Sequence, residues 1–194
     1  AGIRVTTEPT GCALIAIDSE GENQIAVCEG ANAAVSLEGV EFSPTEVVLT
    51  QLEIDLATVE DLARRASGFL AVNAAPARPL PEVLVERVDL FIVNESEWSL
   101  MPELRAARRV VVTLGADGAA LFERGIEVAR VPAMRVDVVN TVGAGDAFCA
   151  ALTIGFAVGL DAETALTAAC AVGADAVGHA EAQPGLRGFG AYLM

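Results

Sequence analysis

The chain has 194 residues and is 53% apolar, so it is long enough and apolar enough to form one domain with a buried core. Its formal net charge of -15 argues against nonspecific binding to nucleic acid or to an anionic membrane, because both need a positive field. All twelve basic residues are arginine, which excludes a phosphate-loop lysine and a Schiff-base lysine.

The apolar runs and turn residues predict an α/β order along the chain. A hairpin comes first, with strands over 10–18 and 24–28 joined by a turn at 19–23. Further strands are predicted over 46–52, 68–73, 89–93, 110–114, 119–124 and 127–131. Helices are predicted over 56–67, 82–87, 145–158 and 161–177, with a short helix expected within 30–44. Strands that alternate with helices indicate a parallel sheet covered by helices.

Two acids in the second half of the chain stand out against this pattern. Asp161 is the expected N-cap of the last helix. Asp175 interrupts the same helix where its other residues are mostly apolar, so its side chain lies either on an exposed stripe or in the interior. The connection at 95–108 is polar, and we assign no element to it.

The histidine and cysteine content excludes further kinds of functional site. The single His179 excludes a histidine-rich metal site and argues against a serine–histidine triad. The four cysteines lack Cys-x-x-Cys spacing, so we expect small, buried, reduced side chains at Cys12, Cys28, Cys149 and Cys170. A disulfide between Cys12 and Cys28 stays an alternative, since the two would face each other across the hairpin. The sequence shows no secretory leader and no uninterrupted membrane-length apolar run, so a cytoplasmic protein is expected.

A glycine turn at Gly143–Gly145 separates an apolar run from a long apolar helix, and Asp146 follows it directly. The first amides of a helix have no intrahelical partner and form an anion site suited to phosphate. A carboxylate beside such a site would repel a resting phosphate, but it could take a proton from an alcohol that attacks the phosphate. The residues alone therefore indicate phosphoryl transfer to a hydroxyl, while a plain capped helix start is the alternative.

The stretch NTVGAGDAF at 140–148 resembles the signature D-T-x-G-A-G-D-x-F of the ribokinase-like carbohydrate kinases. Other segments resemble this family in the family's own order: GENQIAVCEGANAAV, QLEI, VNAAPARPLPEVLVERVDLFIVNESE, VVVTLGADGAALF and AEAQP. The resemblance covers nearly the whole chain, and its motifs are closer to the ribokinase branch than to the fructokinase or adenosine-kinase branches. It implies a three-layer α/β/α fold with a mostly parallel central sheet and a partial β-hairpin lid.

The resemblance also implies roles for the residues around the glycine turn. Asp146 matches the catalytic base that deprotonates the primary hydroxyl of the sugar, and so it also touches the substrate. Gly143, Ala144 and Gly145, with the amide of Asp146, match the anion hole. Glu53 matches a residue that approaches the sugar or the nucleotide phosphates.

A second group of residues matches the family's contacts to nucleotide and metal. Nucleotide contacts are implied for Thr113, Gly115, Asp117, Gly118, Asn94, Asn73 and Cys170. Glu97 completes an N-x-x-E motif with Asn94, which in the family holds magnesium and phosphate through water. Asn140 stands where the signature has an aspartate that ligates a monovalent cation, so the resemblance leaves a requirement for K+ open.

One departure concerns the length of the chain. The family carries a further N-terminal part with the first strands and much of the sugar site, and no segment here matches it. Three alternatives follow: the chain is a fragment of a kinase, a sequence in which only the ordered parts of a kinase are joined together, or a naturally shortened relative. We divide it into a partial lid hairpin at 1–30 and an α/β nucleotide-binding and catalytic core at 31–194. Because the lid is also the family's dimer surface, a homodimer is expected where the lid is complete.

The resemblance predicts an ATP-dependent sugar kinase that uses Mg2+, with ribose as the first substrate candidate. One alternative is a noncatalytic relative that still binds nucleotide through 113–118 and 143–146. Another is an interaction protein that pairs with a second chain through an incomplete sheet edge. Sugar-dependent release of ADP separates the first hypothesis from the second, and a nucleotide-induced thermal shift separates the second from the third.

Overall fold

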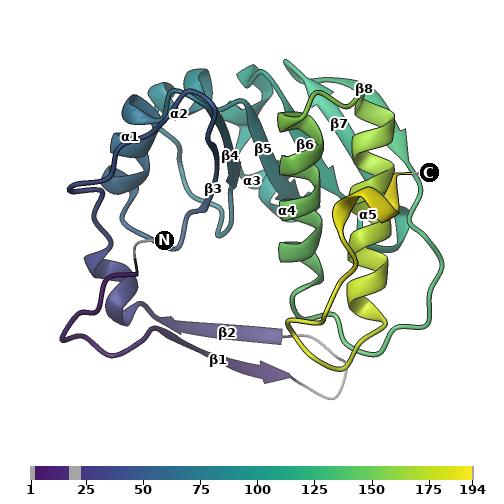
Figure 1. Ribbon diagram of the computed structural model, residues 1–194, viewed down its shortest axis with the longest axis horizontal. Helices are drawn as coiled ribbons and strands as arrows, with labels where there is room; N and C mark the ends of the chain where they lie inside the picture. Colours follow the sequence, from purple (N-terminus) through teal and green to yellow (C-terminus); the bar gives the residue numbers. More distant parts are fainter. Residues whose placement is uncertain (1–2, 18–22, 194) are drawn as a thin grey trace.

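The computed structural model describes residues 3–17 and 23–193 and places them in a six-stranded sheet with helices on both faces and a separate two-stranded hairpin (Figure 1). The hairpin strands are β1 (Cys12–Ile17) and β2 (Asn23–Cys28). The sheet strands are β3 (Val47–Gln51), β4 (Phe69–Asn73), β5 (Leu90–Asn94), β6 (Val110–Thr113), β7 (Ala119–Glu123) and β8 (Ile126–Val131). The α-helices are α1 (Leu56–Arg65), α2 (Glu82–Arg87), α3 (Glu95–Leu100), α4 (Ala144–Ala157) and α5 (Ala162–Val177).

The large sheet keeps its strands in chain order from β3 to β8. Strands β3, β4, β5 and β6 pair in parallel, whereas β7 and β8 pair antiparallel to their neighbours. The parallel pairs need a crossover, and α1, α2 and α3 supply one each. The carboxyl ends of four successive strands consequently meet at one edge of the sheet, where ligands bind in folds of this kind.

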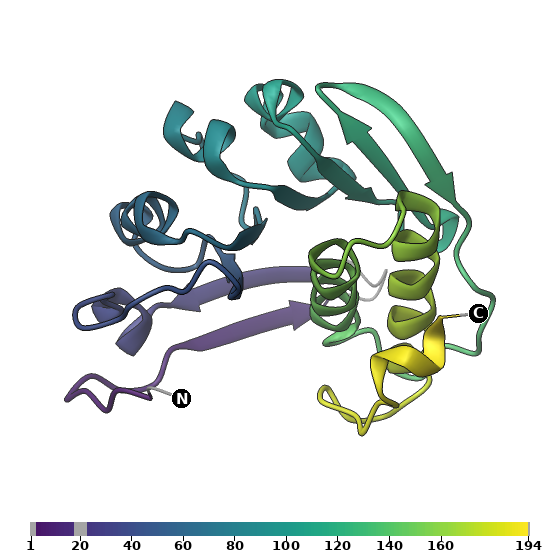
Figure 2. The same ribbon diagram turned by 45° about the horizontal axis from the view of Figure 1, so that its top comes forward.

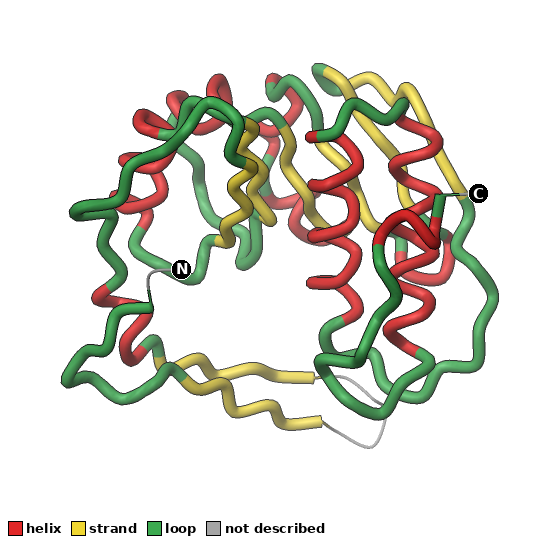
Figure 3. Tube along the Cα trace, viewed as in Figure 1, coloured by secondary structure: helices red, strands yellow, loops and turns green. Residues whose placement is uncertain are grey.

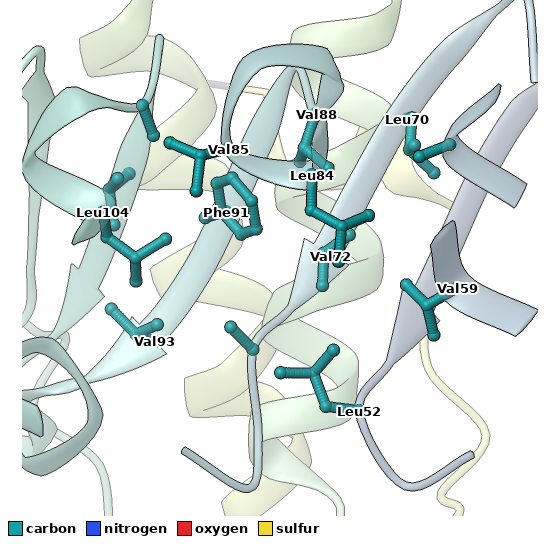
Figure 4. Close-up of a cluster of buried hydrophobic side chains, with 14 of the residues drawn as sticks. Leu52, Val59, Leu70, Val72, Leu84, Val85, Val88, Phe91, Val93 and Leu104 are labelled. Carbon is teal, nitrogen blue, oxygen red and sulfur yellow. The ribbon is translucent and has the colours of Figure 1, made fainter. Parts of the chain in front are cut away.

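Alternate residues of the central strands enter two separate cores. On one face, Leu70, Val72 and Phe91 are fully buried together with Val59 of α1 and Leu84 of α2 (Figure 4). The intervening residues of the same strands belong to the core under α4 and α5, which is formed by Ala71, Leu90, Ile92, Leu152 and Leu166 among others. Figures 1 and 2 show α4 and α5 on the opposite side of the sheet from α1 and α2. The expected three-layer α/β/α architecture with a mostly parallel sheet is therefore confirmed.

The hairpin of β1 and β2 lies away from the six-stranded sheet (Figure 3). Leu14 and Val27 expose 68% and 55% of their surface, although both are apolar. Cys12 and Cys28 are direct cross-strand partners, and both are exposed free thiols. The expectation that all four cysteines are buried is thus wrong for these two, because the hairpin has no helix to cover it. The predicted turn at 19–23 lies almost wholly outside the described residues, as does Asp18 at the end of the first predicted strand.

Most predicted elements agree with the structure to within two residues at each end, but the polar connection at 95–108 contains an element that the sequence reading missed. Helix α3 begins at Glu95, and a 3-10 turn follows it at Pro102–Ala106. The helix starts because Asn94 and Glu97 form a capping box, in which each side chain accepts the other residue's backbone N–H. The prediction of a helix starting after Asp161 is confirmed, since that side chain accepts the amide of Thr164 at 3.0 Å.

Asp175 joins the last helix to the end of the described chain. Its carboxylate accepts the hydroxyl proton of Tyr192 at 2.6 Å, and Nε of Arg187 lies 3.4 Å away. The buried Tyr192 hydroxyl in turn accepts the backbone N–H of Arg187. The hydrogen bond from Tyr192 lowers the pKa of Asp175 most, and His179 and Arg187 lower it further. The acid is therefore a half-buried anchor for the segment that follows α5. Among the described residues, no helix is long and apolar enough to cross a membrane.

Candidate active site

Each parallel strand ends in a polar side chain at the same edge of the sheet. Gln51 at the end of β3 pairs with Asn73 at the end of β4, and Asn94 at the end of β5 pairs with Thr113 at the end of β6. The residues before Asn73, Asn94 and Thr113 are buried and apolar, so the change to polar residues marks the point where these three strands reach the surface. The sheet thus presents a row of amides and a hydroxyl at its carboxyl edge.

Helix α4 begins beside this row with its first amides free. Gly143 is its N-cap, has φ +83, and lies so close to Ala182 that an added Cβ would sit 2.1 Å from the Ala182 carbonyl oxygen. Both observations require glycine there, since other residues rarely adopt this conformation. Among the described residues, the amides of Gly145 and Asp146 have no hydrogen-bond acceptor, and the space around Gly145 is open. These amides point outward at the positive end of the helix dipole, which favours an anion.

Asp146 enters a pocket of about 390 Å³ between α4 and the end of β3. The pocket is lined by Asn32, Leu49, Thr50, Gln51, Glu53, Ile54, Asn73, Asp146 and Cys149. Three of the residues singled out from the sequence, Glu53, Asn73 and Asp146, are thereby brought together from segments up to 93 residues apart (146 minus 53). The pocket is open to solvent on one side, since Glu53 and Asp146 are exposed.

Six of the nine pocket residues were not recognised as site residues in the sequence: Asn32, Leu49, Thr50, Gln51, Ile54 and Cys149. The Gln51 side chain donates from Nε2 to Oδ1 of Asp146 at 3.3 Å and is the one side-chain donor to this carboxylate among the described residues. Asn32 comes from the 3-10 turn at Gly30–Ala34 that follows the hairpin, and Cys149 lies one turn further along α4. The signal for Gln51 was its position at the end of a predicted strand, two residues before Glu53.

The two thiols on α4 and α5 have ordinary packing environments. Burial, with smaller contributions from the negative charges of Asp146 and Glu97, raises the pKa of Cys149 to about 12. Burial also raises the pKa of Cys170 to about 11. Both side chains therefore stay protonated near neutral pH and are poor nucleophiles. Cys170 lies on α5 and does not line the pocket that holds Asp146.

Asn94 and Glu97 hold each other through the capping box at the start of α3. Oε2 of Glu97 accepts the Asn94 N–H at 2.7 Å, and Oδ1 of Asn94 accepts the Glu97 N–H at 2.8 Å. Burial raises the pKa of Glu97, and the hydrogen bond from Asn94 offsets part of that rise. Within residues 3–17 and 23–193, the second carboxylate oxygen of Glu97 and the amide NH2 of Asn94 have no hydrogen-bond partner, which leaves them available for a ligand.

A tight turn follows β6 at the same edge of the sheet. Thr113 ends the strand, residues 115–117 form a 3-10 turn, and the Leu114 N–H donates to the Gly118 carbonyl at 2.8 Å. Gly118 has φ +97, and an added Cβ would lie 2.0 Å from the Val131 carbonyl oxygen. Gly118 is buried in this turn, whereas Gly115 and Asp117 face solvent. The turn thus has a firmly fixed base and an exposed tip.

Asn140 fastens the loop before α4 to the loop after α5. Its Oδ1 accepts the Val142 N–H at 3.0 Å, and its Nδ2 donates to the Ala180 carbonyl at 2.8 Å. The backbone N–H groups of Val139 and Asn140 both donate to the Val177 carbonyl. The side chain predicted as a cation ligand therefore has protein partners for both of its polar atoms.

Comparison with known proteins gives a consistent result. A family model described as pfkB family carbohydrate kinase matches residues 2–187. Ribokinase of Bacillus subtilis is 33% identical over 84% of this chain, which spans 60% of the length of that protein. Deoxyribokinase of Salmonella typhi is 30% identical over 98% of this chain and 71% of its own length. The solved structure of Arabidopsis thaliana ribokinase complexed with ribose and ATP superimposes with a TM-score of 0.78 at 26% identity, over 96% of this chain and 69% of that one.

Proposed function

Because the chain belongs to the pfkB family of carbohydrate kinases, we propose that it transfers the γ-phosphoryl group of ATP to a primary hydroxyl of a sugar, with ribose as the first candidate. One observation supports this most strongly. The carboxylate of Asp146 lies in a pocket beside free helix amides, so a proton acceptor and an anion site share one cavity. The relatives support a sugar and ATP as the small-molecule partners.

The proposed reaction follows from the positions of these groups. A sugar hydroxyl in the pocket would give its proton to Asp146 while its oxygen forms a bond to the γ-phosphorus. The bond from that phosphorus to the β–γ bridging oxygen breaks, and ADP leaves with the electron pair. The amides of Gly145 and Asp146 would stabilise the negative charge on the transferred group in the transition state.

Gln51 would position the base. A neutral amide can hold one carboxylate oxygen without supplying an exchangeable charge, so Oδ1 is fixed by Gln51 and Oδ2 stays free for the hydroxyl. Glu53 and Asn73 would contact the sugar or the nucleotide phosphates from the same pocket. Gln51 is thus a positioning residue, because it acts through Asp146.

The nucleotide would lie along the strand ends towards the turn after β6. Thr113, Gly115, Asp117 and Gly118 would line its binding loop, and Asn94 would contact phosphate. The oxygen of Glu97 that is not used in the capping box fits a carboxylate that meets Mg2+ through water, and bound Mg2+ would neutralise phosphate charge. Cys170 would contact the base from α5.

The hairpin would act as a lid over the pocket, with residues 1–30 as the lid and 31–194 as the core. Asn32 lies in the turn that joins the two and also lines the pocket, so movement of the hairpin would reach the site directly. Exposed apolar residues on the hairpin would pair with the hairpin of a second copy to form a homodimer. The same proposal places the protein in the cytoplasm, where ATP is supplied.

A direct test is to measure ADP and sugar phosphate formed by the 194-residue chain with Mg-ATP and either ribose or 2-deoxyribose. Asp146→Asn is expected to lower turnover by about 10²- to 10⁴-fold, with nucleotide affinity by calorimetry unchanged. Glu86→Gln is the matched control, because it removes an exposed acid on the far face of the sheet and should leave turnover unchanged. Turnover of Asp146→Asn within a few-fold of the parent would remove the proposed base.

A noncatalytic module that binds nucleotide through the turn at 115–118 and the free amides of Gly145 and Asp146 is the second candidate. The chain spans 60% of Bacillus subtilis ribokinase, so part of that protein has no counterpart here. In this case calorimetry would show ADP and ATP binding, while neither sugar would stimulate release of ADP.

A further inference from the structure

The side chain of Asn140 joins the loop that carries the anion-hole amides to the loop after α5. Asn140 lies three residues before Gly143, and its amide bridges to the Ala180 carbonyl at 2.8 Å. Two residues beyond Ala180, the Ala182 carbonyl closes over Gly143. The bridge therefore holds together the two loops whose contact sets the start of α4.

The orientation of this amide is determined by its partners. The Val142 backbone N–H can only donate, so the atom 3.0 Å from it must be the side-chain oxygen. The Ala180 carbonyl can only accept, so the atom facing it must be the NH2 group. Exchanging the two atoms would place donor against donor and acceptor against acceptor, which rules out the flipped amide.

This arrangement does not fit a monovalent cation at Asn140. A hard cation needs oxygen ligands, and a site between Asn140 and the Ala180 carbonyl would present it with an N–H donor. The Asn140 oxygen already accepts the Val142 N–H and carries no negative charge. The charge attraction and the free oxygen that an aspartate would offer are therefore both missing.

We propose that Asn140 takes the place of a monovalent cation in this chain: its NH2 group makes the link between the loop before α4 and the loop after α5 that a cation would otherwise make through oxygen ligands. The start of α4 is then set by hydrogen bonds internal to the protein. Its geometry, and the affinity of its amides for an anion, are independent of K+. The link itself follows from the two loops and does not depend on kinase activity.

Substitution by aspartate offers the sharpest test. In Asn140→Asp, a carboxylate oxygen faces the Ala180 carbonyl, so two acceptors are opposed, and a cation between them would relieve the repulsion. In Asn140→Ala the link is absent, and a cation has no side-chain ligand to restore it. The parent, Asn140→Asp and Asn140→Ala therefore differ in their expected response to K+.

The experiment measures the melting temperature and the calorimetric affinity for ADP in potassium chloride and in choline chloride at equal ionic strength. The parent is expected to give the same values in both salts. Asn140→Asp is expected to bind ADP about 3- to 10-fold more weakly than the parent in choline, as for loss of one hydrogen bond, and to recover in potassium. Asn140→Ala is expected to be weakened equally in both salts.

Gln183→Glu is the control for a general effect of charge, because it adds a carboxylate at another exposed position of the same loop. A parent whose melting temperature or ADP affinity rises in potassium would overturn the proposal. So would an Asn140→Asp variant that responds to potassium no more than Gln183→Glu. If the chain binds no ADP at all, the proposed kinase function fails, while the melting temperatures in the two salts still decide this inference.

Discussion

Strands β5 and β1 are both largely apolar, yet they occupy opposite environments. LFIVN in β5 places Leu90 and Phe91 at 0% exposure, with helices on both sides. CALIAI in β1 leaves Leu14 68% exposed, in a hairpin that no helix covers. An isolated two-stranded hairpin is marginally stable in water, so the stability of this chain resides in the six-stranded sheet and its helices.

The exposure of the apolar side chains in β1 and β2 indicates that they do not stabilise the hairpin itself and have another role. Opposed residues of an antiparallel pair share a face, so Leu14 and Ala26 lie on one face and Ala13 and Val27 on the other. Both faces of the hairpin are apolar at these positions. One face for the substrate and one for a second copy would account for this under the proposed function.

The largest loss of stability is expected from truncating a core side chain in the six-stranded sheet. Phe91→Ala should destabilise the chain by about 3–5 kcal/mol, because a fully buried ring leaves a cavity. Leu14→Ala removes a side chain of related size from the hairpin and should change stability by less than about 0.5 kcal/mol. Urea unfolding measures both variants. Equal losses would show that the hairpin is packed in solution.

Gly143→Ala is expected to have the next largest effect. The new Cβ would meet the Ala182 carbonyl at 2.1 Å in a conformation with φ +83, and such strain costs about 1–3 kcal/mol. Gly145→Ala is the matched control, since the space there is open and alanine favours a helix. Gly145→Ala should keep the melting temperature of the parent while its methyl group weakens ADP binding. Destabilisation by both variants alike would contradict this assignment.

Tyr192→Phe tests the anchor at the end of α5. It removes the hydroxyl that donates to Asp175 at 2.6 Å, and we expect a loss of about 1–2 kcal/mol. The melting temperature should fall by about 2–8 °C for a domain of this size. Calorimetric unfolding of the parent and the variant measures the difference.

The pH dependence of that loss follows from the lowered pKa of Asp175. A lowered folded-state pKa stabilises the fold above the unfolded-state value of about 3.9, and this contribution is lost as the pH falls through the folded-state value. The difference between Tyr192→Phe and the parent should therefore be complete at neutral pH and shrink below about pH 4. A difference that stays constant down to acid unfolding would assign the effect to packing alone.

The smallest effect on stability is expected from making the hairpin polar. Leu14→Ser together with Val27→Ser should change the free energy of unfolding by no more than about 0.5 kcal/mol per site, because both side chains are exposed. The same change should shift a dimeric parent towards monomer in sedimentation experiments. A variant that stays dimeric would place the interface elsewhere on the molecule.

Much of the fold could be predicted because it depends on local patterns. The local signals are the alternation of apolar and polar positions, helix caps such as Asp161, and glycine turns, and each acts over a few residues. They predicted element boundaries close to those observed. Helix α3 was missed because it has six residues and no apolar stripe of its own, and because the pair Asn94 and Glu97 matches a family motif as well as a helix cap.

The parts of the site that could not be predicted depend on contacts between distant segments. Gln51 and Asp146 are 95 positions apart and meet because β3 ends beneath the start of α4. Asn140 and Ala180 are 40 positions apart and meet because α5 returns the chain to the loop before α4. No pattern within a single segment could indicate either pair.

The sequence by itself determined the order of strands and helices, the glycine turn before Asp146 and the acid that follows it, because each depends on backbone preferences and hydrophobic periods within one segment. Only the tertiary structure decided that the apolar hairpin is exposed and that Glu53, Asn73 and Asp146 share a pocket. It also decided that the Asn140 side-chain NH2 group donates to the Ala180 carbonyl. Burial and hydrogen-bond partners are set by whichever segments pack together in space, and a residue's own neighbours along the chain do not specify them.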